Sequence, residues 1–299
     1  MSPRDFLLYA LIIFGWSTSW LPLKGQIGFV APEVSILWRF MIAAALCFLI
    51  ARFRGLTLRF PFHLHLQFAA LGLFIFSTNF TLFYYASPHL ASGLMAVVFS
   101  TASMMNILMV AGLTRTAPHP RELFASAIGL GGIILIFLPE FHLSSAALPA
   151  LLLCIVGTLC FCAGNQVSAA LQRQNVAVIS ANSWGMVYGC VVLAFFALFL
   201  GNPLVIDYRL PYLSGLIWLA VFSSVLTFAC YLTLVGRIGA GKAGYATVIF
   251  PVFALLISTV FEKYQWGVLP FAGICLVVAG NILMPVSYTH LRAHETLPY

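Results

Sequence analysis

Charged residues are scarce in this chain. Only 7% of its 299 residues are Asp, Glu, Lys or Arg, and 62% are hydrophobic. A soluble domain carries roughly 25% charged residues, because it must cover its surface with groups that water solvates. The composition therefore excludes a soluble globule. Continuous apolar runs such as MIAAALCFLIA and VVLAFFALFL also disfavour a transmembrane β-barrel, whose strands alternate apolar and polar residues over about 10 positions.

Patterns for metal binding and catalysis are missing as well. The seven cysteines all fall within apolar runs and none forms a CxxC pair, so we interpret them as packing residues and expect neither a metal nor a cofactor. The loops hold no HxxxD, HExxH or DxxxD pattern, which disfavours a membrane-embedded enzyme. The net charge of +7 comes from single basic residues between apolar runs, a distribution that indicates membrane topology and not nucleic-acid binding.

Apolar runs of membrane-spanning length follow one another along the chain. A helix needs about 20 residues to cross about 30 Å of hydrocarbon. Short loops marked by proline or glycine separate the runs and leave no room for a soluble domain. The predicted fold class is an all-α polytopic membrane protein with ten transmembrane helices. They cover residues 6–23, 34–51, 67–86, 90–113, 123–138, 148–170, 179–200, 212–235, 243–261 and 268–284.

Basic residues in the short loops set the predicted orientation, because cytoplasmic loops carry an excess of Lys and Arg. If the N-terminus is cytoplasmic, the outer segments hold only Lys24, Arg209 and Lys263. We therefore predict a multi-pass protein of the cell inner membrane with both termini in the cytoplasm. The cytoplasmic segments then hold nine basic residues, namely Arg4, Arg52, Arg54, Arg59, Arg115, Arg121, Arg173, Arg237 and Lys242.

The two ends of the chain differ in character. The first apolar run shows no small-residue cleavage pattern before Lys24, so we interpret it as a retained span and not a signal peptide. The last stretch, VSYTHLRAHETLPY at residues 286–299, is polar and patternless. We interpret it as a non-native tail and leave it out of functional reasoning.

Ten spans divide into two halves of five, which we predict to be residues 1–141 and 142–285. The segments YASPHLASGLMAVVFSTASMMNIL from Tyr85 and LVGRIGAGKAGYATVIFPVFALLI from Leu234 share a small-residue loop that enters a long apolar helix. Because five is odd, the second half must enter the membrane from the opposite side. The predicted architecture is an inverted repeat, which is common among secondary transporters with a substrate site near the midplane.

Four segments in order carry a family resemblance: GWSTSWLPLK, PEVSILWRF, YYASPHLASGLMAV and GRIGAGKAGYATVIFPVFALLISTVFE. With them the chain resembles the drug/metabolite transporter superfamily, EamA type, over residues 6–284, and within it the aromatic amino acid exporters of bacterial inner membranes. The resemblance implies two inverted five-helix EamA repeats and export by alternating access. It also implies a central cavity lined mainly by the first, third, fourth, sixth, eighth and ninth helices. One departure is that the fourth span has STASMM where the superfamily often has proline; its counterpart in the ninth span, Pro251, is present.

Ionisable groups are absent from the predicted mid-depth of the spans. All seven acidic residues and all seven histidines lie at span ends, in loops or in the tail. Proton-driven antiport normally requires such a group inside the membrane, so we favour a facilitative carrier. Solvated loop charges can still couple, which leaves proton coupling open. Arg39 and Lys24 are the only basic candidates near the pathway, which is little for a carrier of nucleotide sugars.

Neutral polar and aromatic residues then form the candidate site. They line up at helical spacing, and amides, hydroxyls and aromatic faces suit an amphipathic solute such as an amino acid. Packing within or between helices is the alternative: it is favoured for any single hydroxyl and stays open for the asparagines. The predicted substrate-cavity residues are Trp16, Trp20, Asn79, Phe83, Phe99, Ser103, Phe161, Asn165, Thr227, Tyr231 and Tyr245.

Two features of the sequence predict movement or bending. Gly241 and Gly244 in GAGKAG are candidate hinge residues between the eighth and ninth spans. Pro251 removes one backbone hydrogen bond from the ninth span, and a static packing kink is the alternative. In the first span we expect Trp16 and Trp20 to share one helix face at i and i+4. Pro22 can end or bend that helix, and Lys24 would lie at its outer rim.

The predicted function is export of aromatic and other neutral amino acids across the inner membrane. The partners are a small-molecule amino acid and the lipid bilayer, with no nucleic acid; the oligomeric state is open, and a monomer is consistent with the sequence. The alternatives are a broad drug or metabolite efflux carrier of the same superfamily, with or without proton coupling, and the disfavoured membrane-embedded enzyme.

Overall fold

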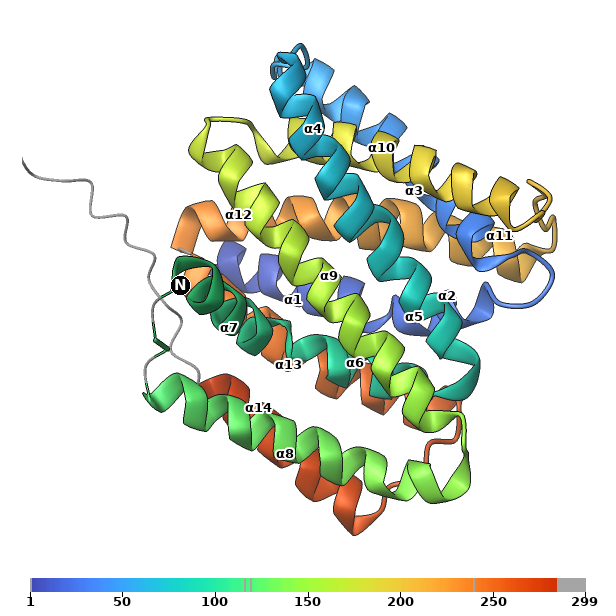
Figure 1. Cartoon of the computed structure of the whole chain (residues 1–299), viewed down its shortest axis with the longest axis vertical. Coiled ribbons are helices and arrows are strands. Elements are labelled where there is room, and N and C mark those ends of the chain that lie inside the picture. The colour runs from blue at the N-terminus through green and yellow to red at the C-terminus, as the bar shows by residue number, and fades with distance from the viewer. Residues whose placement is uncertain (1, 116, 119, 239, 284–299) are drawn as a thin grey trace, which may run out of the picture.

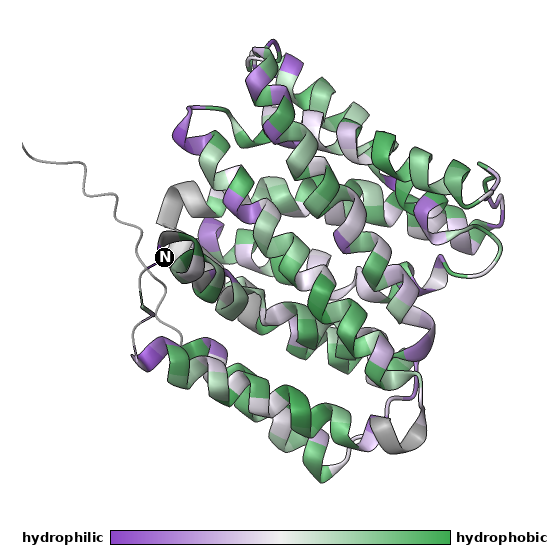
Figure 2. Cartoon of the chain, viewed as in Figure 1, coloured by the Kyte–Doolittle hydropathy of each residue, from purple (hydrophilic) through white to green (hydrophobic). Residues whose placement is uncertain are grey.

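Helices make up the regular structure of this chain. The computed structural model describes residues 2–115, 117–118, 120–238 and 240–283, and in these ranges it contains helices and no strand. Eight helical segments are long and apolar enough to cross a membrane, and two shorter apolar helices, Ile249–Phe261 and Val268–Leu283, complete the set found among the described residues. The predicted fold class is confirmed. Hydrophobic residues dominate the helices, and hydrophilic ones gather mostly at helix ends and in loops (Figure 2).

The helices follow the predicted spans in order. In the first half they are α1 Pro3–Ser17, α2 Trp20–Gly25, α3 Pro32–Phe53, α4 Phe62–Leu71, η1 Gly72–Asn79, α5 Phe80–Ala86, η2 Ser87–His89, α6 Ser92–Ser100, α7 Ala102–Thr114 and α8 Pro120–Leu143. In the second half they are α9 Ala147–Arg173, α10 Val178–Phe199, α11 Leu210–Ile217, η3 Trp218–Leu226, α12 Thr227–Ile238, α13 Ala240–Phe261 and α14 Val268–Leu283.

The first span is interrupted, which corrects the expectation of one continuous helix. α1 ends at Ser17 and α2 begins at Trp20. In the gap, the Thr18 hydroxyl donates to the Phe14 carbonyl at 2.7 Å and the Ser19 hydroxyl donates to the Trp16 carbonyl at 2.7 Å. Such bonds compete with the regular ladder, and Pro22 has no N–H to donate to the Thr18 carbonyl one turn earlier.

The third and eighth spans share a feature that the sequence did not reveal. Each contains a π-helical segment, η1 in the third span and η3 in the eighth. π-Helical turns are rare and occur frequently at functional sites. Hydroxyls bind the widened turns: Ser77 donates to the Gly72 carbonyl at 3.1 Å, and Thr227 donates to the Phe222 carbonyl at 2.6 Å. Because the third and eighth spans occupy equivalent places in the two halves, the shared π-helix fits the two-repeat fold.

The fourth span bends without proline. α6 ends at Ser100 and α7 begins at Ala102, with Thr101 between them. The Ser100 hydroxyl donates to the Val97 carbonyl and the Thr101 hydroxyl to the Val98 carbonyl, at 2.7 and 2.6 Å. In the ninth span Pro251 lies inside α13, as predicted. Hydroxyls in STASMM therefore interrupt one repeat where proline occupies the other.

Equivalent spans of the two halves pack against each other. α3 pairs with α10, α6 with α13 and α8 with α14. In Figure 1 the α3–α10 and α8–α14 pairs lie at opposite edges of the bundle, with the remaining helices between them. Pairing of the second span with the seventh, the fourth with the ninth and the fifth with the tenth is what a two-fold relation between repeats produces. The boundary between the two repeats therefore runs through the middle of the bundle, between the helices of each pair.

Glycines allow the α8–α14 pair to approach closely. A Cβ atom added at Gly273 would lie 2.5 Å from the Gly132 carbonyl oxygen, and one added at Gly280 would lie 2.7 Å from the Ala125 carbonyl oxygen. Without these glycines the two backbones would have to separate. Small residues at helix contacts are the usual means of close packing in membranes, where lipid is as apolar as the side chains.

We expect Gly273→Ala to destabilise the protein by about 1–3 kcal/mol, because the added methyl forces α14 away from α8. The measurement is the thermal unfolding midpoint in detergent. Gly131→Ala is the matched control on α8, since a Cβ there meets no atom within 4 Å. Equal midpoints for the two variants would contradict the role assigned to the close contact.

Candidate functional site

Aromatic side chains from both halves meet at the boundary between the repeats. Trp16 lies against three rings of the second half, with ring centroids 5.8 Å from Phe228, 5.3 Å from Tyr231 and 5.9 Å from Phe250. Trp20 lies against two rings of the first half, 5.3 Å from Phe83 and 5.7 Å from Phe99. Phe99 joins the two groups, since it is also 6.5 Å from Phe250 and 4.8 Å from Phe161. We call these eight residues the central aromatic cluster.

Six of the predicted cavity residues belong to this cluster. They are Trp16, Trp20, Phe83, Phe99, Phe161 and Tyr231. The expectation that Trp16 and Trp20 share a face of one helix is wrong, because the break after Ser17 places them on separate helices. As a result Trp16 contacts the second repeat and Trp20 contacts the first.

Other predicted residues have contacts that hold helices together. Asn79 is buried, and its side-chain amide donates to the Gly157 carbonyl on α9 at 2.8 Å. Thr227 is buried against α1, where its hydroxyl oxygen would lie 2.0 Å from a Cβ at Gly15. For Asn79 and Thr227, the observed contacts match the alternative that these side chains pack helices together. Asn165 is half-buried on α9.

The remaining predicted positions lie at the ninth and fourth spans. Pro251 follows Phe250, whose carbonyl accepts a hydrogen bond from the Ser17 hydroxyl at 2.9 Å, so α1 is tied to α13 beside the proline. Gly241 and Gly244 are in the helical part of α13, but their surroundings lie outside the described residues. The side chains of Ser103 and Tyr245 also lie outside the described part of the chain.

Arg39 is the polar residue whose importance the sequence reasoning underestimated. It is only 3% exposed, although α3 is a membrane-spanning helix. Its guanidinium donates to the Ser224 hydroxyl at 3.1 Å and to the Ser223 hydroxyl at 3.4 Å, both on η3. The guanidinium carbon also lies 4.4 Å from the Phe80 ring centre and 5.3 Å from that of Phe40. The signal available in the sequence was an arginine within an apolar run, ILWRFM.

A pocket of about 290 Å³ lies beside Ser224. It is formed between α3, α10 and the eighth span, and its lining includes Arg54 at the end of α3 that is predicted to be cytoplasmic. Phe228 is also part of its wall. The pocket therefore borders one hydrogen-bond partner of Arg39 and one member of the central aromatic cluster, whereas Arg39 itself is not part of its lining.

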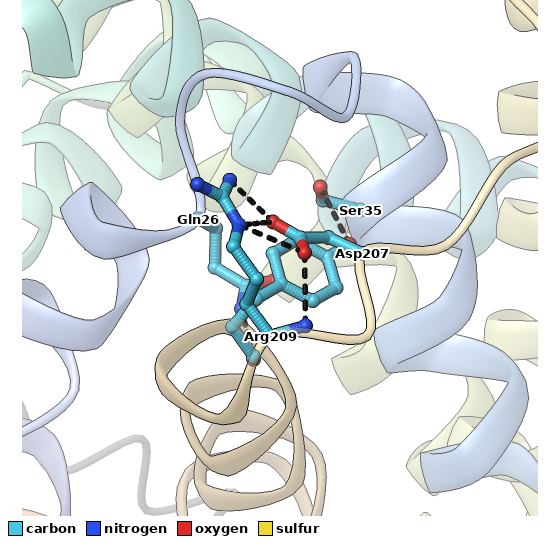
Figure 3. A network of polar contacts seen from close by, with 5 residues as sticks. Gln26, Ser35, Asp207 and Arg209 are labelled. Carbon is cyan, nitrogen blue, oxygen red and sulfur yellow. Dashed lines mark hydrogen bonds and ion pairs between the residues drawn. The ribbon is translucent and has the colours of Figure 1, made fainter.

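At the opposite end of α3, loop residues of the second repeat form a polar network with the first repeat (Figure 3). Arg209 pairs with Asp207 through hydrogen bonds of 2.8 and 3.0 Å, and this pairing lowers the pKa of Asp207. Beside it, the Gln26 amide donates to the Tyr212 carbonyl at 2.9 Å, and the Tyr212 hydroxyl donates to the Ser35 hydroxyl at 2.9 Å. These bonds join the first repeat to α11 at the end of the bundle that is predicted to be outer.

Lys24 and Glu262 form an ion pair at the same end. Their Nζ and Oε1 atoms lie 2.7 Å apart, and Lys24 also donates to the Leu90 carbonyl at 3.0 Å. Glu262 accepts from the Ser92 amide at 2.8 Å and from the Ser258 hydroxyl at 2.7 Å. Burial of Glu262 opposes ionisation, but the hydrogen bonds from Lys24, Ser92 and Ser258 prevail and lower its pKa. The pair connects α2 and α6 of the first repeat to the end of α13.

Comparison with known proteins places the chain among transporters. The sequence profile of the EamA-like transporter family matches residues 5–138 and 148–285. Protein PagO of Salmonella typhimurium is 23% identical over 87% of this chain and 84% of its own length. The uncharacterized inner membrane transporter YedA of Escherichia coli K12 is 26% identical over 93% and 91%. A "Probable amino-acid metabolite efflux pump" of the same strain is 20% identical over 94% of both chains. One solved crystal structure has a TM-score of 0.66 at 16% identity over 95% of this chain and 96% of that one, a likeness of fold.

We expect the stability of the protein to fall as the pH drops below the ordinary pKa of Glu262, 4.5. Because the pKa is lowered in the folded state, the ionised carboxylate stabilises the fold at every pH above 4.5, and this contribution is lost as the pH falls through the lowered value. The measurement is the thermal unfolding midpoint of the wild type and of Glu262→Gln between pH 7 and pH 3. The wild type should lose more between these limits; parallel curves would contradict the assignment.

Proposed function

This chain belongs to the EamA-like transporter family and is a multi-pass membrane transporter, and on that premise we propose that it exports aromatic and other neutral amino acids. Export would cross the inner membrane by alternating access. The observation that carries the proposal is the central aromatic cluster at the boundary between the repeats. Ser224, which accepts from the Arg39 guanidinium, lies one helical turn from Phe228 of this cluster. Aromatic faces bind the apolar part of such a solute, and the polar groups pair with its charged ends.

Two resemblances support the choice of substrate class. Within the superfamily that its four motifs indicate, the chain most resembles the aromatic amino acid exporters. One relative over nearly its whole length carries the name "Probable amino-acid metabolite efflux pump". A relative named an inner membrane transporter supports the proposed location.

The transport is proposed to be facilitative. The carboxylates of Glu33, which is buried, and of Glu262, which is half-buried, lie at the ends of helices, and both have partners: Glu33 accepts from Asn202 and from Tyr85, and Glu262 pairs with Lys24. Neither carboxylate lies at the depth in the membrane at which the central aromatic cluster lies. A proton-coupled exporter needs a group there that gains and loses a proton as the protein changes state.

Alternating access fits the placement of the inter-repeat contacts. We propose that residues 1–141 and 142–285 move against each other as the two repeats, with both termini in the cytoplasm. The Lys24–Glu262 pair and the Tyr212 hydrogen bonds join the repeats at the outer end, so they must break before a solute can leave on that side. Gly241, Gly244 and Pro251 remain candidates for the bending positions.

In proteoliposomes, we expect the purified protein to release preloaded tryptophan and phenylalanine at least tenfold faster than empty vesicles. Collapsing the pH gradient with an ionophore should change the rate less than twofold, because no proton is coupled. The panel includes lipophilic amines to test the broader efflux alternative. Release no faster than from empty vesicles would overturn the proposed substrate class, and loss of release without the gradient would overturn facilitation.

We expect Trp16→Ala to lower this release more than Trp218→Ala at equal protein density in the vesicles. Trp16 lies in the central aromatic cluster, whereas Trp218 stacks on Phe222 at 4.4 Å and touches the exposed Phe14. Trp218 is therefore the matched tryptophan control outside the cluster. We expect a fivefold loss of the release rate for Trp16→Ala and less than twofold for Trp218→Ala. Equal losses would indicate that Trp16 is a packing residue and not part of the site.

A further inference from the structure

The Arg39 guanidinium is a buried charge with only neutral neighbours. Arg39 lies seven residues after the start of α3 at Pro32, about 10 Å along the helix at about 1.5 Å per residue, so it lies within the membrane-spanning segment. Its contacts are the Ser223 and Ser224 hydroxyls and two phenyl rings. Lys24 pairs with Glu262 and Arg209 pairs with Asp207, and neither of these ion pairs involves Arg39. A charged side chain at such a position marks a functional site by default.

Part of the hydrogen-bonding capacity beside Arg39 is unused. The Nη1 atom of Arg39 and the Tyr84 hydroxyl are buried, and neither has a hydrogen-bond partner elsewhere among the described residues. The two groups lie close enough for the guanidinium to donate to the Tyr84 oxygen. Even then the Tyr84 O–H and a second N–H of Nη1 have no acceptor, so two donors lie in one place, and each costs free energy as long as it stays unpaired. Two converging donors, one of them cationic, match a carboxylate.

We infer that Arg39 Nη1 and the Tyr84 hydroxyl form the subsite that binds the carboxylate of the transported solute. The inference rests on the proposed function and deepens it, because it names the chemical class: a small monocarboxylate with an apolar, aromatic body. A phosphate-bearing solute is less well matched, since Arg39 is the single cation recorded at the site and its other donors already bind Ser223 and Ser224.

The surroundings place an aromatic body next to this subsite. On α5, Phe80, Phe83 and Tyr84 are spaced i, i+3 and i+4, which puts them on one helix face. Phe80 and Tyr84 lie beside Arg39, whereas Phe83 packs against Trp20 in the central aromatic cluster. A solute on this face would therefore meet the cationic donor at one end and aromatic rings at the other.

A pocket lies next to the subsite, separated from Arg39 by Ser224. This pocket, between α3, α10 and the eighth span, has Ser224 and Phe228 in its wall, one helical turn apart. Ser224 holds the Arg39 guanidinium, and Phe228 contacts Trp16. The pocket begins at the Arg54 end of α3, which is the end predicted to be cytoplasmic. Entry from that side is the direction that export requires.

The test uses two probes with the same indole ring. Indole-3-acetate has a carboxylate and no amine, and tryptamine has an amine and no carboxylate. Binding to the purified full-length protein is measured as ligand-dependent stabilisation against heat. We expect indole-3-acetate to stabilise the wild type, and Arg39→Gln to weaken its binding at least tenfold while changing that of tryptamine less than twofold. Arg52→Gln, the same substitution at an exposed position of α3, is the matched control and should bind like the wild type.

Milder variants keep the test valid if Arg39→Gln does not fold. Tyr84→Phe removes only the hydroxyl beside Arg39 and should weaken indole-3-acetate binding about threefold to tenfold. Arg39→Lys keeps the charge without the fork of donors and should fall between the wild type and Arg39→Gln. Wild-type affinity for indole-3-acetate in Arg39→Gln or Tyr84→Phe, or no binding by the wild type, would overturn the subsite. Binding that depends on Arg39 together with no amino acid release in vesicles would keep the subsite and overturn the proposed substrate.

Discussion

Every polar group inside the hydrocarbon must find its partner within the protein, and the structure follows from how that requirement is met. Helices pair the backbone N–H and C=O groups with each other. Where this regular hydrogen bonding is interrupted, short hydroxyl side chains donate to backbone carbonyls. Thr18 and Ser19 donate to carbonyls of the first span where α1 gives way to α2, and Ser77 and Thr227 donate into the π-helical turns of the third and eighth spans. The helix breaks are thus confined to segments that carry hydroxyls. Several buried polar atoms of the described residues have no such partner, and among them the Nη1 atom of Arg39 belongs to a positively charged group.

The breaks and the two-repeat pairing together place the site. Equivalent spans pack across the midline, so the outer pairs α8–α14 and α3–α10 hold the edges of the bundle while the interrupted spans lie between them. An interrupted helix offers side chains in directions that a straight helix does not. The break between α1 and α2 sends Trp16 to the second repeat and Trp20 to the first, and η3 brings Ser223 and Ser224 to Arg39. The site is consequently built from contacts between repeats.

The fold was predictable from sequence to a much greater degree than the site. Hydropathy located the spans because twenty apolar residues in a row allow little else. Aromatic residues such as Phe83 and Phe99 could be assigned to the interior because helical spacing puts them on one face with polar residues of the candidate site. The use of Asn79 as a tie to α9, the split of Trp16 from Trp20 and the contacts of Arg39 depend on partners far away in the chain. No local pattern encodes a hydrogen bond between residues 39 and 224, so these features required the structure.

Because the guanidinium of Arg39 bridges the repeats, binding and movement share the same contacts. Arg39 belongs to α3 of the first repeat, and the hydroxyls that hold it belong to η3 of the second. Any rocking of one repeat against the other must stretch or break these two hydrogen bonds, at a cost that rises when a buried cation loses partners. A carboxylate bound at Nη1 would supply the missing negative charge and lower that cost. An occupied site would therefore cross between states more easily than an empty one, so the return of the empty carrier would be the slower half of a net export cycle.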